Sequence, residues 1–288
     1  MSGGLEVTFW GVRGSTPCAG EQYRRYGGHS SCVSLEVEGE APIVFDLGTG
    51  LRPYGASLGG AAEVRVLLTH LHWDHVQGLP FFAPLFFADS RLDVFAPRQE
   101  EGPVGEVFAG MMRPPYFPIT PDALAAPIRF HDAGNDDFAV GEAKVRSRWI
   151  RHVGPTLGFR VDWNGASVAY LPDHGQGCGD PPSDDYVPDD VLALCDGADL
   201  VIHDAQHTRD EFGPKRHWGH CTVDYAVHVA KEAGAHTVAL FHHDPTHGDE
   251  MLDEINAAAE DHAASRDLGG LITATEGRRV QLATDQTR

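Results

Sequence analysis

Three histidines and an aspartate fall within six positions of the chain, at His70, His72, Asp74 and His75. In extended backbone, residues two apart point to the same side, so His70 and His72 are placed to bind one ion together. Asp74 and His75 follow where a helix is expected to begin, and there they face a second ion beside the first. Imidazole and carboxylate groups suit zinc and other divalent transition metals. Because such groups packed together without an ion are costly to desolvate, the pattern predicts a metal site.

The apolar run before this cluster is one of several short runs that end in His or Asp. We expect strands over 43–45, 64–69, 145–150, 168–171, 200–202 and 238–241. The polar residues that follow these runs are Asp46, His70, His152, Asp173, the pair His203 and Asp204, and the group His242, His243 and Asp244. Functional groups of α/β proteins gather at the carboxyl ends of strands. The repeated pattern therefore predicts one site along one edge of a sheet system.

The rest of the chain is expected to complete a single domain over residues 1–288. Further strands are expected at 5–10, 32–37 and 271–282, and helices at 222–233 and 249–266. Thr222 is a suitable N-cap for the first of these helices, and Gly234 lies just past its end. The proline-rich segment 91–134 is expected to be a loop, either an ordinary covering loop or a lid over the site.

The glycine-rich turn at 11–17 lacks the Lys-Ser/Thr ending of a phosphate-binding loop, and its Arg13 is expected to be solvated. His207 is expected in a loop, although its spacing from His203 imitates a helical zinc motif. His243, Asp244 and His247 are expected to flank the ligand strand without a catalytic role.

The net charge is -20, from 22 basic and 42 acidic residues. Nucleic-acid affinity depends largely on Lys and Arg neutralising phosphates, so this balance argues against a long nucleic acid as partner. A small anionic substrate remains suitable, because bound cations reverse the sign of the charge locally.

No apolar run approaches the ~20 residues of a membrane span, and the first residues do not resemble a secretory signal. The five cysteines, Cys18, Cys32, Cys178, Cys195 and Cys221, are scattered and include no C-x-x-C pair. Dispersed cysteines of odd number indicate free thiols in a reducing compartment, so a cytoplasmic location is expected. Assembly as a homodimer is compatible with these features.

The run His70-Leu71-His72-Trp73-Asp74-His75 resembles the signature of the metallo-β-lactamase superfamily. Asp46 in D-L-G-T-G, His152, Asp173 and His242 match the other recurring positions of that superfamily in order and rough spacing. The resemblance covers nearly the whole chain. It implies an α/β fold, a four-layer αββα sandwich, with the metals at one edge of the two sheets.

Within the superfamily, the chain is similar to the phosphodiesterase branch, which includes ribonuclease Z and enzymes that cleave cyclic nucleotides. Asp173 stands where many lactamases have a cysteine, and Ile202-His203-Asp204-Ala205 resembles the His-Glu-Ala segment of the branch. Gly219-His220-Cys221-Thr222 resembles its Gly-His-Ser-Thr, whose histidine faces the scissile phosphate. Two departures are the missing glycine- and lysine-rich arm of ribonuclease Z and the Val153-Gly154-Pro155 that follows His152 in place of Pro-Gly-Gly.

The matched positions imply two divalent ions per chain. Zinc is the favoured metal, and manganese and iron are alternatives. His70, His72 and His152 would bind one ion, Asp74, His75 and His242 the other, and Asp173 would bridge them. Asp46 would orient a ligand histidine from behind. Asp74 would also orient the attacking hydroxide, and His220 would act as general acid with the support of Asp204 and His203.

The resemblance implies a hydrolase, most simply a phosphodiesterase that cleaves a small phosphodiester such as a cyclic nucleotide. Two ions ~3.5–4 Å apart lower the pKa of a bridging water, so a metal-bridging hydroxide would be the nucleophile. A thioesterase, lactonase or lactamase on the same metals is an alternative. A metal-binding sensor without turnover is a third hypothesis, disfavoured because no ligand position is lost.

Overall fold

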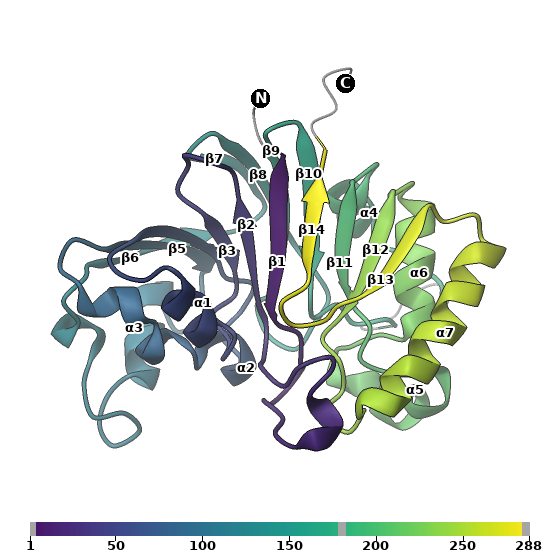
Figure 1. Ribbon diagram of the computed structural model, residues 1–288, viewed down its shortest axis with the longest axis horizontal. Coiled ribbons are helices and arrows are strands. Elements are labelled where there is room, and N and C mark those ends of the chain that lie inside the picture. The colour runs from purple at the N-terminus through teal and green to yellow at the C-terminus, as the bar shows by residue number, and fades with distance from the viewer. Residues whose placement is uncertain (1–3, 178–182, 284–288) are drawn as a thin grey trace.

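The computed structural model describes residues 4–177 and 183–283, and its strands form two seven-stranded sheets (Figure 1). The first sheet has the order β14-β1-β2-β3-β4-β5-β6. Its strands are β1 (Leu5–Gly11), β2 (Cys32–Glu36), β3 (Ile43–Phe45), β4 (Glu63–Leu67), β5 (Arg91–Pro97), β6 (Ile128–Ala133) and β14 (Arg279–Leu282). The second has the order β13-β12-β11-β10-β9-β8-β7. Its strands are β7 (Asp136–Val140), β8 (Ala143–Trp149), β9 (Leu157–Trp163), β10 (Ala166–Leu171), β11 (Leu200–Asp204), β12 (Thr237–Phe241) and β13 (Gly270–Thr273).

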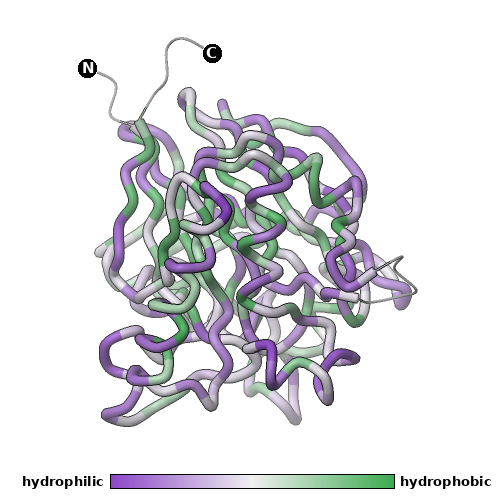
Figure 2. The backbone as a smooth tube through the Cα atoms, turned by 90° about the vertical axis from the view of Figure 1, so that its right-hand side faces the viewer, coloured by the Kyte–Doolittle hydropathy of each residue, from purple (hydrophilic) through white to green (hydrophobic). Residues whose placement is uncertain are grey.

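An apolar layer lies between the two sheets, where Leu5, Val7 and Phe9 of β1 alternate toward the interior. The ring of Phe45 on β3 stacks on that of Tyr170 on β10, with centroids 4.4 Å apart. In Figure 2 the apolar segments accordingly run through the inside of the molecule. Burial of this layer from both sheets is the main force that holds them together.

Helices cover the outer faces of both sheets. On the first sheet these are α1 (Leu51–Ser57) and α3 (Val104–Met111), and on the second α4 (Asp189–Cys195), α6 (Val223–Glu232) and α7 (Asp249–Ser265) (Figure 1). The short helices α2 (Trp73–Val76) and α5 (Arg209–Lys215) lie in the connections. Single 3-10 turns cover Glu21–Tyr23, Leu79–Phe81, Ala83–Phe86, Pro121–Ala123 and Arg216–Trp218. The predicted four-layer αββα sandwich is confirmed.

Parallel pairing brings the expected ligands to one edge. Strands β3 to β6 run parallel in the first sheet, and β10 to β13 run parallel in the second. Their carboxyl ends lead into α2 and into the loops after β10, β11 and β12. The cap predicted for α6 is also present, since the Thr222 side chain accepts a hydrogen bond from the Tyr225 amide.

The proline-rich segment 91–134 is more regular than the loop that we expected. It begins with β5, ends with β6 and contains α3. Pro97 is the last residue of β5, a position where a missing amide does little harm to the ladder. A lid role for the remaining residues of this segment stays a prediction.

Among the described residues, Cys18, Cys32 and Cys195 are free thiols, whereas Cys178 lies outside them. No helix in 4–177 or 183–283 combines the length and the apolar character that a bilayer crossing requires.

Candidate metal centre

The predicted ligands converge into two adjoining groups. The ligand atoms of His70, His72 and His152 lie within 4.8 Å of one another, and the same limit holds for Asp74, His75 and His242. A third set with this spacing, His70, His75 and Asp173, connects the two trios. Residues from four separate segments, which follow β4, β8, β10 and β12, thus surround one small volume.

Asp173 lies between the trios, and its two carboxylate oxygens face different sides. Oδ2 is 3.0 Å from His75 Nε2 and 3.4 Å from His242 Nε2. Oδ1 is 3.6 Å from His152 Nε2 and 4.0 Å from His70 Nε2. This is the arrangement that a carboxylate bridging two ions requires.

The side chains present fit divalent ions. Nε2 of His70 is buried and has no hydrogen-bond partner, which is costly unless an ion accepts its lone pair. The Nδ1 of His72 lies 3.1 Å from the Nε2 of His152, and the Nε2 atoms of His75 and His242 are 3.3 Å apart. Ring nitrogens that converge in this way, beside two carboxylates, are a donor set suited to zinc and related metals.

Burial and neighbouring charges set the protonation of these groups. Burial lowers the pKa of His70 well below its ordinary value and lowers the pKa of His152 to about 4, so both are neutral ligands at neutral pH. Burial raises the pKa of Asp173, but the neighbouring His242, His75 and His70 lower it by more. The pKa of Asp173 is therefore well below its ordinary value.

His75 behaves in the opposite way. Burial lowers its pKa, but the carboxylates of Asp74, Asp173 and Asp46 outweigh this effect and raise the pKa well above the ordinary value. Without an ion, His75 therefore holds a proton that a bound metal would displace.

Asp46, expected to orient a ligand histidine, contacts His75 on the side of the ring away from the centre. His75 Nδ1 lies 2.7 Å from Asp46 Oδ2, so its Nε2 faces the centre. The same carboxylate accepts hydrogen bonds from the Thr69 amide at 2.8 Å and from the Tyr170 hydroxyl at 2.8 Å. Sequence reasoning missed Thr69 and Tyr170. Thr69 directly precedes His70, but Tyr170 stands in an apolar run and carries no local signal of this contact.

His152 is held by a glycine that the sequence marks only as the neighbour of His220. Its Nδ1 donates to the Gly219 carbonyl at 2.7 Å and leaves Nε2 facing the centre. Gly219 has a φ of 86°, and a Cβ there would lie 2.5 Å from His152 Nδ1. Both the left-handed backbone and the close approach require glycine.

His220 lies beside the bridging position. Its Nδ1 is 2.7 Å from Asp204 Oδ2 and 3.7 Å from Asp173 Oδ1. Burial lowers the pKa of His220, but Asp204 raises it more, so the pKa lies above the ordinary value. Asp204 also accepts from the Gln206 amide at 3.0 Å, which fixes its carboxylate. A buried histidine next to the centre, with its pKa raised by a carboxylate, is of the kind that acts as a general acid.

His203 lies beside this pair but bonds elsewhere. Its Nδ1 donates to the backbone oxygen of Asp204 at 2.8 Å, and its Nε2 is 3.1 Å from His174 Nδ1. Any support that it gives to His220 therefore passes through Asp204.

The remaining histidines of this region have other partners. His207 is fully buried, with its Nδ1 3.6 Å from Asp244 Oδ2 and its ring 5.9 Å from that of His220. His243 Nε2 donates to the Ala274 carbonyl, and His247 Nε2 lies 2.9 Å from Glu211 Oε1. His243 and His247 therefore link the loop after β12 to the surrounding fold.

The turn at 11–17 contacts the centre. The prediction that its Arg13 is solvated is wrong. Arg13 is fully buried because carbonyls replace water: it donates to Gly27 at 2.7 Å and to His247 at 2.6 Å. The backbone amide of Ser15 donates to Asp74 Oδ2 at 2.8 Å. The turn therefore positions a predicted ligand through its backbone.

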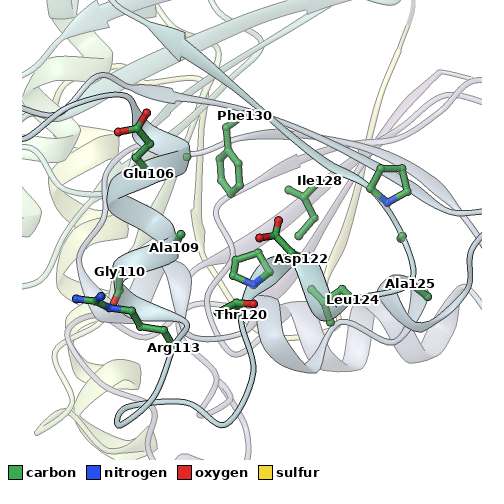
Figure 3. A pocket seen from close by; sticks show the side chains of 14 residues that line it. Glu106, Ala109, Gly110, Arg113, Thr120, Asp122, Leu124, Ala125, Ile128 and Phe130 are labelled. Carbon is green, nitrogen blue, oxygen red and sulfur yellow. The ribbon is translucent and has the colours of Figure 1, made fainter.

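A pocket of about 860 Å³ lies apart from this centre, between α3 and β6 (Figure 3). Glu106, Arg113, Asp122 and Phe130 are among its lining residues, and none of the predicted site residues lines it. The candidate site is therefore defined by the converging ligands and not by this cavity.

Comparison with known proteins assigns the family. Residues 47–243 match the family model described as the beta-lactamase superfamily domain, and the chain belongs to this family. It is 28% identical to a ribonuclease Z of Natronomonas pharaonis over 274 residues, which cover 83% of this chain and 86% of the relative. The metallo-beta-lactamase fold protein YhfI from Bacillus subtilis superposes with a TM-score of 0.70 at 18% identity, covering 97% of this chain and all of the other. A diphosphatase from the PhnP family superposes with a TM-score of 0.69 at 19% identity, covering 97% and 98%.

The chain is thus a metal-dependent hydrolase of the metallo-β-lactamase superfamily, and the resemblance to its phosphodiesterase branch is confirmed. The prediction that no long nucleic acid is a partner is wrong, because a relative that matches 83% of the chain is named ribonuclease Z. The charge of -20 is a sum over the whole molecule, whereas bound cations set the local field at the centre.

Proposed function

We propose that this chain hydrolyses phosphodiester bonds with two divalent ions, zinc or alternatively manganese or iron. The substrate that we propose is a small phosphodiester such as a cyclic nucleotide. The observation that carries the proposal is the position of Asp173, whose two oxygens face separate groups of ligands while His220 lies 3.7 Å away.

In this proposal His70, His72 and His152 hold one ion, Asp74, His75 and His242 hold the other, and Asp173 bridges them. Bound ions of this kind supply a nucleophilic water at neutral pH and neutralise the charge of a phosphodiester. Asp46 keeps His75 in its ligand tautomer, and the Gly219 carbonyl does the same for His152. Asp74 also orients the attacking water, and the Ser15 amide fixes its carboxylate.

His220 is the proposed general acid. Asp204 accepts a hydrogen bond from Nδ1–H and stabilises the imidazolium, so that the proton on Nε2 is available for the leaving oxygen. A phosphodiester develops charge on that oxygen during cleavage, and a positioned acid contributes ~10²–10⁴-fold to such a step. His203 supports Asp204 by donating a hydrogen bond from Nδ1 to the backbone oxygen of Asp204.

RNA is a second candidate substrate, favoured by the relative named ribonuclease Z that matches 83% of this chain. Hydrolysis of an RNA phosphodiester uses the same ions and the same acid. The two candidates differ only in what lies beyond the scissile phosphate.

The test is a substrate panel with protein reconstituted separately with zinc, manganese and iron. The panel contains cyclic nucleotides, a linear dinucleotide and a precursor RNA beside a thioester, a lactone and a lactam. We expect phosphodiesters to be cleaved with the highest kcat/KM. Faster hydrolysis of the thioester, lactone or lactam than of every phosphodiester would overturn the proposal.

A further inference from the structure

The centre opens to solvent at one corner. His70, Asp74, His75, Asp173 and His242 are buried, whereas His72 is exposed. A substrate that reaches the ions therefore arrives beside His72. What surrounds this residue decides which part of a substrate is recognised in addition to its phosphate.

Two exposed tryptophans are chain neighbours of residues at that corner. Trp73 directly follows His72 and is 68% exposed, and Trp218 is 49% exposed. Trp218 precedes Gly219, whose carbonyl bonds to His152 Nδ1, and His152 Nε2 lies 3.1 Å from His72 Nδ1. Trp73 and Trp218 are thus the chain neighbours of His72 and of the glycine that bonds to His152, the two ligands whose ring nitrogens meet at this corner.

The corner has the character of a binding surface. Val153, next to His152, and Trp149, at the end of β8, are also exposed at 53% and 40%. The Trp218 ring is held in place by Lys215, whose Nζ lies 5.6 Å from the ring centroid and 3.0 Å from Asp244 Oδ2. Large apolar side chains that gather at the opening of a site mark it for a ligand with an apolar face.

We propose that Trp73 and Trp218 form a nucleobase-binding subsite, so that the substrate is a nucleoside phosphodiester. This inference rests on the proposed function and narrows its substrate class. Indole rings present flat faces, and every base has a flat face to stack on them. Stacking tolerates any base and leaves the phosphate free to reach the ions.

The experiment compares two substrates on the metal-loaded full chain. One is a cyclic nucleotide, and the other is the same cyclic ribose phosphate with a 1-O-methyl group in place of the base. Stacking of one base contributes about 1–3 kcal/mol, so the nucleotide should have a KM about 5- to 150-fold lower. Trp73→Ala and Trp218→Ala should bring the ratio of the two KM values toward one, whereas Trp73→Phe and Trp218→Phe should retain most of it.

Phe87→Ala is the control, because Phe87 is an exposed aromatic residue, 46% exposed, that has no part in the proposed subsite. It should keep the wild-type ratio. Metal content is measured for each variant, so that a loss of ions is not mistaken for a loss of stacking.

Binding of a nucleoside monophosphate, followed by tryptophan fluorescence, separates this inference from the proposed function. Nucleotide binding that both Trp→Ala variants lose, in a protein that cleaves no phosphodiester, would support the subsite and sink the function. Equal KM values for the two substrates in the wild type would overturn the subsite and leave the function intact. A change of oligomeric state in Trp73→Ala, with an unchanged KM ratio, would identify the surface as a subunit contact and also overturn it.

Discussion

Asp204 Oδ2 lies 2.7 Å from His220 Nδ1 and joins the last residue of β11 to the loop before α6. His220 is thereby held beside Asp173 with its pKa above the ordinary value. In the proposed function, this pair supplies a proton donor that does not belong to the proposed ligand trios.

We predict that His220→Ala keeps both ions and the fold but lowers kcat on a phosphodiester by ~10²-fold or more, with a smaller change in KM. The variant loses a proton donor that acts mainly in the transition state. Metal analysis and kinetics beside the wild type check this. A variant that loses metal would identify His220 as a ligand, and near-normal turnover would remove it from the mechanism.

Asp204→Asn should shift the pH dependence of kcat. The charge of Asp204 raises the pKa of His220, so the acid form persists to higher pH, and activity declines as pH rises through that pKa. Removal of the charge lowers the pKa, and the basic limb of the kcat profile should move to lower pH. An unmoved basic limb in the variant would assign that limb to another group.

The reconstituted protein should contain about two divalent ions per chain, since the ligands are too many for one tetrahedral site. Asp173→Ala should lose at least one ion, because its carboxylate faces both trios. Elemental analysis after metal reloading at neutral pH is the measurement. At most one ion in the wild type would contradict the dinuclear mechanism.

Metal binding to the metal-free protein should release protons at neutral pH. Carboxylates raise the pKa of His75 well above its ordinary value, so it is protonated until an ion displaces the proton. Calorimetric titrations with zinc in buffers of different ionisation enthalpy measure the number of protons released. Zinc binding without proton release would show that His75 is already neutral.

Gly219→Ala should weaken metal binding at the His152 side. The added Cβ would lie 2.5 Å from His152 Nδ1, and the left-handed backbone at φ 86° adds strain of about 1–3 kcal/mol. Gly213→Ala is the matched control, because its Cβ would meet no atom within 4 Å. Metal titration of the two variants should differ, and equal affinities would show that His152 is not held by this glycine.

The ligand cluster could be predicted from the sequence because its spacing rules are local. His70 and His72 share one side of extended backbone, and Asp74 and His75 lie in the short helix α2, close to where their positions indicate a helix. Short apolar runs that end in Asp46, Asp173 or His242 also suffice to place these residues together, since the carboxyl ends of parallel strands meet at one edge.

Contacts between distant segments were decided only by the tertiary structure. Tyr170 looks like an ordinary core residue until the packing of β10 against β3 brings its hydroxyl to Asp46. Arg13 appears as a loop residue, yet the carbonyls that bury it come from Gly27 and His247. The prediction from net charge, which argued against a long nucleic acid, was wrong for the same reason. Net charge is a sum over the chain, whereas recognition depends on which groups the fold brings to one place. Local periodicity and spacing determine an element and the ligands that it carries, but partners from other segments are fixed only when the two sheets pack.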